Sequence, residues 1–240
     1  IMLSDTVRQE IVSGDPQFAV AATGTAVFAP GRPVRESYLL RADRSGRIDT
    51  LPFARAAYSE FRVSPDGSAL AATITGASEM ELRVLDLTNG HTVKVGSFAE
   101  GGAGNPIWRP NGSAVLTTHS VISAGAWIRL QREIRVPDGT QSALPPDSGL
   151  LRSFSATGEL IVRRSTNGDV VIVGRTGVRR KVLTPESSWT TISRDGRFVQ
   201  WTTFAQGHYE IFAGPVNRDE PGTRITPEGC LDALWAPDGR

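Results

Sequence analysis

Short segments in which apolar and polar residues alternate run along the whole chain, and turns join them in pairs. Residues 61–105 contain four such segments, predicted as strands at 61–64, 69–75, 81–87 and 92–98. The same order recurs further on, with strands expected at 153–155, 159–164, 169–173 and 179–183, and again at 190–193, 198–203, 210–216 and 223–225. A single four-stranded sheet cannot bury both of its faces, so neighbouring units must stack.

One turn sequence marks each unit, and its fullest copy is Ser64-Pro65-Asp66-Gly67. Serine or aspartate, proline and glycine suit a type I turn that closes a hairpin through a left-handed glycine. The turn glycines are separated by 43, 45, 46, 38 and 43 residues, a period typical of propeller blades. They are Gly24, Gly67, Gly112, Gly158, Gly196 and Gly239.

The predicted fold is therefore all-β, a single β-propeller over residues 1–240, built of four-stranded antiparallel blades. Complete blades are expected at 17–60, 61–105, 106–149, 150–187 and 188–229. A sixth blade would be split, with outer strands from residues 1–16 and a first strand, 231–235, from residues 230–240. Because the chain stops inside a hairpin turn, we expect it to be part of a longer protein.

Aspartate recurs at one turn position, in Asp66, Asp195 and Asp238. A ring of carboxylates could bind a metal, but Asn111 and Thr157 occupy the same position in other copies. A turn tolerates these replacements because their side chains also bond nearby backbone amides. We interpret the aspartates as structural residues of the turns.

Sequence motifs for catalysis or cofactor binding are absent. The chain has no Gly-x-Ser-x-Gly elbow, no phosphate-binding loop and no metalloprotease motif, and His91, His119 and His208 lie at non-equivalent positions of different units. No catalytic residue, metal or cofactor is therefore expected in this chain.

The net charge and the hydropathy limit the classes of partner that we expect this chain to bind. The 26 basic and 25 acidic residues leave a net charge of +1, which gives no reason to expect nucleic acid as a partner. No apolar run approaches the roughly 20 residues of a membrane helix, so this segment is not expected to insert into a membrane.

The loops opposite the Pro-Asp-Gly turns vary between units, and variable loops on a repeated scaffold commonly carry recognition. We therefore expect a protein or a small ligand to bind at this loop face. Packing at the seams between blades is the alternative role for Trp189 and His208. The candidate binding residues are Glu60, Asn105, Trp189, His208 and Asp232.

Segments 61–67 (FRVSPDG), 107–112 (IWRPNG) and 234–239 (LWAPDG) resemble the Trp-Ser-Pro-Asp-Gly core of the TolB-type, PD40 or WD40-like propeller repeat. Segments 18–30 and 38–51 followed by 61–67 resemble the first two blades of the propellers in bacterial membrane-anchored serine/threonine kinases. The chain itself has no kinase motif.

The kinase resemblance implies a non-catalytic sensor or interaction domain outside the cytoplasm, tethered through a transmembrane segment that this chain lacks. Two other interpretations stay open. Similar propellers gate the hydrolase domain of prolyl-oligopeptidase-type serine peptidases, and others are stand-alone periplasmic scaffolds of the TolB kind.

Overall fold

The protein is described here by a computed structural model. It describes residues 18–20, 24–28, 36–75, 79–98, 103–123, 126–136, 138–144, 150–158, 160–164, 169–174, 179–183, 188–205, 207–218, 220–226, 228–230 and 233–235. All regular elements in these ranges are β-strands. No helix in this part of the chain is long and apolar enough to cross a membrane.

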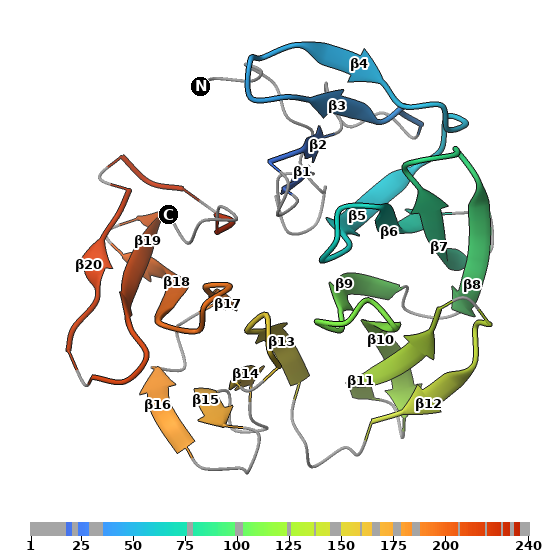
Figure 1. Ribbon diagram of the computed structural model, residues 1–240. Coiled ribbons are helices and arrows are strands. Elements are labelled where there is room, and N and C mark those ends of the chain that lie inside the picture. Colours follow the sequence, from blue (N-terminus) through green and yellow to red (C-terminus); the bar gives the residue numbers. More distant parts are fainter. Residues whose placement is uncertain are drawn as a thin grey trace. The chain divides into compact units, whose positions relative to one another are not determined.

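The chain divides into two compact units, Ile1–Leu144 and Pro145–Arg240. The first unit holds three four-stranded sheets, drawn from blue to yellow-green in Figure 1. Their strands are β1 (Phe18–Val20), β2 (Ala26–Phe28), β3 (Leu40–Ala42) and β4 (Ile48–Thr50); β5 (Tyr58–Val63), β6 (Ala69–Thr75), β7 (Met80–Asp86) and β8 (Thr92–Phe98); and β9 (Ala103–Trp108), β10 (Ala114–Ser123), β11 (Ala126–Arg135) and β12 (Gln141–Ala143).

The second unit holds two sheets of the same kind, drawn from yellow to red in Figure 1. Their strands are β13 (Leu150–Phe154), β14 (Leu160–Arg164), β15 (Val170–Gly174) and β16 (Arg179–Leu183); and β17 (Ser188–Ile192), β18 (Phe198–Ala205), β19 (His208–Pro215) and β20 (Thr223–Arg224).

Every sheet is an antiparallel meander in which each strand pairs with the next one along the chain. The turn between the first and second strands therefore lies at one end of its sheet, the turn end, and the connection between the second and third strands at the opposite end, the loop end. The turn glycines have φ between 71° and 84° wherever the structure describes them. This left-handed backbone is the reason for glycine at these positions.

The core of the first unit lies between neighbouring sheets. Innermost strand β5 packs against β1 on one side and β9 on the other. Phe61 of β5 is 1% exposed and contacts a cluster that includes Val27 and Leu39 from the preceding sheet. Burial of a side chain of this size contributes roughly 1.5–3 kcal/mol. Each sheet is thus covered by its neighbour, as expected for stacked repeats.

The second unit is packed in the same way, with β13 against β17. Val162, Ile172 and Val199 are fully buried in its core. Trp201 of the β17–β20 sheet packs against this core, and its ring stacks on that of Phe212 with centroids 6.1 Å apart. Gly222 lies against this pair, and a β-carbon there would come within 2.6 Å of Trp201 Cζ2.

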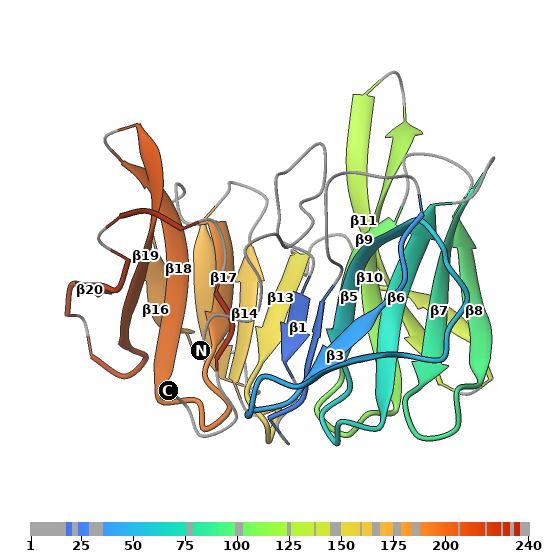
Figure 2. The same cartoon turned by 90° about the horizontal axis from the view of Figure 1, so that it is seen from above.

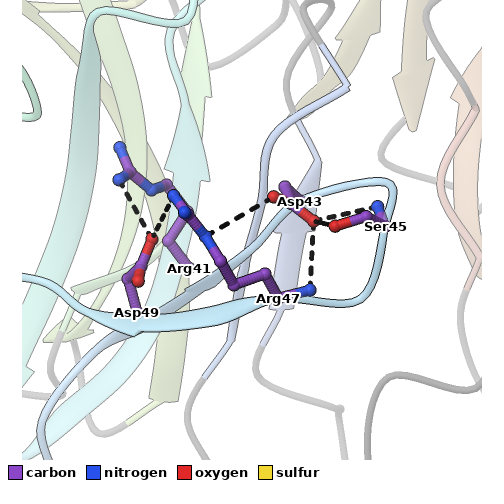
Figure 3. A network of polar contacts seen from close by, with 5 residues as sticks. All are labelled: Arg41, Asp43, Ser45, Arg47 and Asp49. Carbon is purple, nitrogen blue, oxygen red and sulfur yellow. Dashed lines mark hydrogen bonds and ion pairs between the residues drawn. The ribbon is translucent and has the colours of Figure 1, made fainter.

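A network of polar contacts holds the turn between β3 and β4 (Figure 3). One Asp43 carboxylate oxygen accepts hydrogen bonds from the backbone N–H and the hydroxyl of Ser45, at 2.9 and 2.6 Å, and from the backbone N–H of Arg47 at 3.0 Å. These bonds lower the pKa of Asp43. The Asp43 side chain thus accepts hydrogen bonds from nearby backbone amides, the role predicted for the aspartates of the other turns.

Strand bounds differ from the sequence-based prediction mainly at the innermost strands. β5 begins at Tyr58 instead of residue 61, β13 at Leu150 instead of 153, and β17 at Ser188 instead of 190. In contrast, β6 and β8 have the predicted bounds. The innermost strands begin early because each contains a bulge, which interrupts the strict alternation used to find strands.

The predicted ring of six blades is not shown. The described residues form five four-stranded sheets, and residues 1–16 lie outside the described part of the chain. The expected strand at 231–235 is also not observed, since residues 233–235 belong to no strand and 231–232 are not described. The number of blades in a closed ring stays a prediction.

Candidate functional site

A β-bulge recurs in the innermost strand of four sheets. In β5, Tyr58 pairs with Ile74 and Phe61 pairs with Ala72. The chain therefore advances three residues along β5 where it advances two along β6, so β5 contains one extra residue. Strands β9, β13 and β17 show the same kind of register shift against their partners. Bulges redirect side chains and often occur beside binding sites. Three of the candidate residues lie in these bulges, seven positions before their turn glycines: Glu60, Asn105 and Trp189.

Glu60 and Asn105 are brought together across the boundary between two sheets of the first unit. The Glu60 carboxylate accepts a hydrogen bond from the backbone N–H of Asn105. Asn105 has φ of 52°, a left-handed conformation that asparagine adopts more readily than most residues. The Glu60 backbone is held by the buried Thr73, because the Glu60 N–H donates a hydrogen bond to the Thr73 hydroxyl oxygen at 3.1 Å. This carboxylate links two sheets, which is a structural role that the sequence did not indicate.

Trp189 has a backbone conformation that is unusual for its side chain, with φ of 40°. Left-handed backbone is uncommon for non-glycine residues, and it is a genuine outlier for bulky ones. The Trp189 ring meets the Tyr209 ring edge-to-face at 5.6 Å, and Phe204 meets Tyr209 at 5.0 Å. Phe204 is 59% exposed. We call Trp189, Phe204 and Tyr209 the aromatic cluster; it lies at the loop end of the β17–β20 sheet.

His208, also at this loop end, belongs to a separate polar group on the other face of β19. Its Nε2 lies 2.9 Å from a Glu210 carboxylate oxygen, and the same oxygen accepts a hydrogen bond from Arg224 at 3.0 Å. Glu210 is 4% exposed, so its charge is neutralised by partners rather than by water. His208 is therefore held by an acidic residue of its own strand, and this contact lies within one sheet, not at a seam between blades.

The structure thus separates the predicted candidates into different settings. Trp189 contributes to the aromatic cluster, in which Phe204 is exposed; Glu60 and Asn105 bind each other, and His208 binds Glu210. Asp232 lies outside the described residues. Phe204 was missed because it directly follows the predicted strand 198–203 and was assigned no role; an aromatic residue at the end of a strand, close to Gly207, was the available signal.

Turn aspartates have the geometry expected of structural residues. One Asp66 oxygen accepts hydrogen bonds from the Ser64 hydroxyl at 2.6 Å and the Ser68 amide at 3.0 Å. Asp195 repeats this with the Arg197 amide, and these bonds lower the pKa of Asp195 to about 2. Asp238 and Gly239 are not among the described residues. Within the described part of the chain, no three His, Cys, Asp or Glu residues are placed to hold a metal ion.

Comparison with solved structures shows which fold these sheets form. TolB from Acinetobacter baumannii matches 86% of this chain with a TM-score of 0.68 and 19% sequence identity, and the chain spans 53% of that protein. A putative TolB from Agrobacterium tumefaciens matches 93% of this chain, with 86% of its own length, the same TM-score and 14% identity. The chain has a β-propeller fold.

A solved structure that is not a TolB protein is also similar. A prolyl endopeptidase structure matches 85% of this β-propeller with a TM-score of 0.56 and 14% identity, over 35% of the endopeptidase. No protein-family profile and no curated protein matches the chain by sequence. The similarity therefore defines the fold, whereas the function must be argued from the residues of this chain.

Proposed function

We propose that this β-propeller is a non-catalytic interaction domain that binds a protein partner at the loop end of the β17–β20 sheet. The observation that supports this function is the aromatic cluster. Phe204 keeps 59% of its surface exposed although Tyr209 and Trp189 lie beside it. Aromatic residues gathered at a surface are enriched in the centres of protein interfaces, where they bury large areas.

The backbone at Trp189 adds a second argument. A left-handed conformation at a bulky residue costs on the order of 1–3 kcal/mol, and such strain concentrates at functional sites. Asparagine or glycine would adopt φ of 40° more easily, and Asn105 does occupy the equivalent bulge of another sheet. Tryptophan at this position is therefore better explained by what its ring contacts than by what the strand requires.

Within this function, we favour an extracytoplasmic sensor or interaction propeller of a bacterial serine/threonine kinase, with phosphoryl transfer in a domain outside this chain. The order of segments 18–30, 38–51 and 61–67 supports this origin. A TolB-like periplasmic scaffold is the alternative favoured by the two TolB structures, and a gating propeller of a peptidase is the one favoured by the prolyl endopeptidase.

Site-specific photo-crosslinking tests the binding site directly. A photoreactive phenylalanine analogue at position 204 would be compared with the same analogue at position 198, since Phe198 lies on the same strand, at the turn end, and is 39% exposed. We expect a defined crosslinked partner from position 204 and none from position 198. Crosslinking at 198 alone would place the binding surface at the wrong end of the sheet.

A substitution at the bulge provides the second test. Trp189→Asn suits the left-handed backbone and removes the ring, so we expect the unfolding free energy to change by less than about 1 kcal/mol while the crosslinked partner is lost. Unchanged binding in a folded Trp189→Asn variant would exclude the aromatic cluster. Turnover of peptide, ester or phosphoryl substrates by the purified chain, abolished by a point mutation in it, would contradict the non-catalytic assignment.

A further inference from the structure

The hairpin of β10 and β11 is longer than the sheet that contains it. The two strands pair over ten residues each, from Ala114 opposite Arg135 to Ser123 opposite Ala126. Strand β9 pairs with β10 only as far as His119, and β12 pairs with β11 only as far as Arg132. The remainder, residues 120–123 and 126–130, forms an arm that rises above the ends of the neighbouring strands in Figure 2.

The outer edge of β11 changes from paired to unpaired at a defined point. The last backbone bond on this side joins the Leu144 N–H to the Gln131 carbonyl at 3.0 Å. Residues 145 and 146, which follow next in the sequence, are prolines and have no N–H to donate to a ladder. Among the described residues, none pairs with Ala126–Leu130 on this edge.

Strand alternation identifies the backbone groups that are presented there. In an antiparallel ladder, the N–H and C=O of every second residue point to the same side. Because the Gln131 carbonyl points toward β12, the backbone groups of Arg129 and Trp127 point to the same outer edge. Two residues therefore offer four main-chain hydrogen-bonding groups in the spacing that an added strand requires.

The side chains of the arm show what kind of strand would fit. Ile122 is 55% exposed and Ile128 is 38% exposed, and the pairing register places them on opposite faces of the hairpin. Long apolar edges invite strand addition, and proteins usually protect them with several charges. Here Arg129 is the single charged residue of residues 126–130. A partner strand with apolar residues and one carboxylate complements this edge.

We propose that the outer edge of the arm, residues 126–130 of β11, is a docking site for an extended, apolar and acidic segment of a partner protein, which adds to β11 as a further strand. Antiparallel pairing of two copies of this edge would bring two Arg129 side chains close together, and the like charges disfavour that arrangement. This site is in the first unit and does not depend on the aromatic cluster of the second.

The experiment uses the whole chain and a synthetic peptide, acetyl-Thr-Val-Glu-Val-Thr-Val-Thr-amide, as the probe. Amide hydrogen exchange would be followed at Trp127 and Arg129, and at Thr92 of the exposed edge strand β8, whose N–H points away from β7, as the control edge. With peptide at millimolar concentration, we expect about tenfold slower exchange at the two arm amides and no change at Thr92. The same peptide with alternate amides N-methylated should have no effect, because it cannot form the ladder.

Two variants separate main-chain pairing from charge. Arg129→Pro removes an N–H that points outward and keeps the bonds between β11 and β10, so the protein should stay folded without protection of Trp127 by the peptide. Arg129→Ala keeps the N–H and should retain weaker protection. Unchanged exchange at Trp127 and Arg129, equal protection by the N-methylated peptide or equal protection at Thr92 would overturn the proposal. A concentration-dependent dimer that Arg129→Pro abolishes would replace the partner by a second copy.

Discussion

The indole Nε1 of Trp235 donates a hydrogen bond to the backbone carbonyl of Thr191, at 3.3 Å. Trp108 makes the same bond to the carbonyl of Arg62, at 2.9 Å, across the boundary between the β5–β8 and β9–β12 sheets. Both tryptophans precede their turn glycines by four residues. Trp235 therefore lies against β17 in the way that Trp108 of β9 lies against β5, although residues 233–235 form no strand.

Replacement of Trp108 by phenylalanine should therefore destabilise the protein. The carbonyl of Arg62 would keep its ladder partner on β6 but lose the indole donor, at a site where Trp108 is 8% exposed, and the loss of one such hydrogen bond costs about 0.5–1.5 kcal/mol. Trp235→Phe should have a smaller effect, since its bond is longer. Thermal unfolding of both variants measures this; a larger loss for Trp235→Phe would contradict the assigned order.

The turn at Gly67 gives a prediction about backbone conformation. Gly67 has φ of 79°, and a β-branched side chain there costs on the order of 1–3 kcal/mol. Ser68→Ala removes an exposed hydroxyl bonded to Asp66 but keeps the backbone bond of its amide, so its effect should be within about 0.5 kcal/mol. Equal midpoints of urea unfolding for Gly67→Val and Ser68→Ala would disprove the turn assignment.

Gly222 is constrained by space rather than by φ. Gly222→Ala should destabilise the β17–β20 sheet by about 1–3 kcal/mol, because its β-carbon would overlap the Trp201 ring and lie 3.1 Å from the Ala213 carbonyl. Trp201→Phe in the same chain should recover part of this loss. A double-mutant cycle on the unfolding free energy measures the coupling, and strictly additive effects would show that the overlap does not decide stability.

The buried position of His119 leads us to expect that the stability of the protein depends on pH. The side chain is 5% exposed, its Nδ1 has no hydrogen-bond partner among the residues that the structure describes, and burial together with the nearby Arg132 lowers its pKa below 6.5. Since the folded pKa is lower than the unfolded one, the stabilising contribution is complete above pH 6.5 and is lost as pH falls through the folded pKa. His119→Phe should flatten the decline in unfolding free energy between pH 7 and 5; an unchanged slope would assign it to other groups.

The repeat could be predicted from the sequence because each unit contains a turn with a strict conformational requirement. Glycine at positions 67, 112, 158 and 196 marked the hairpins, and alternation gave strands such as β6 and β8 with their observed bounds. The bulges could not be predicted from the alternation of apolar and polar residues. An extra residue in one strand interrupts this alternation, so the apolar residues before and after it no longer follow one period of two.

The site was harder to predict for a related reason. Trp189 was recognised as a candidate, but nothing in the sequence around it shows that its backbone is left-handed. The ring contact between Trp189 and Tyr209 joins β17 to β19, two strands that are not neighbours in the sheet. Such a contact depends on the direction in which the bulge points the Trp189 side chain, which the sequence does not show. The carboxylate of Glu60 was expected to face a ligand, whereas the fold directs it to Asn105 of the next sheet.

The recurring bulge has a consequence for how such a protein can change. At the bulged position the chain carries glutamate in β5, asparagine in β9 and tryptophan in β17, while the strands around it keep their pairing. A residue that lies outside the regular ladder can be exchanged without altering the register of the sheet. Mutation can therefore vary what one sheet presents at its rim, independently of the others, and new specificities can arise in one repeat while the rest of the array preserves stability.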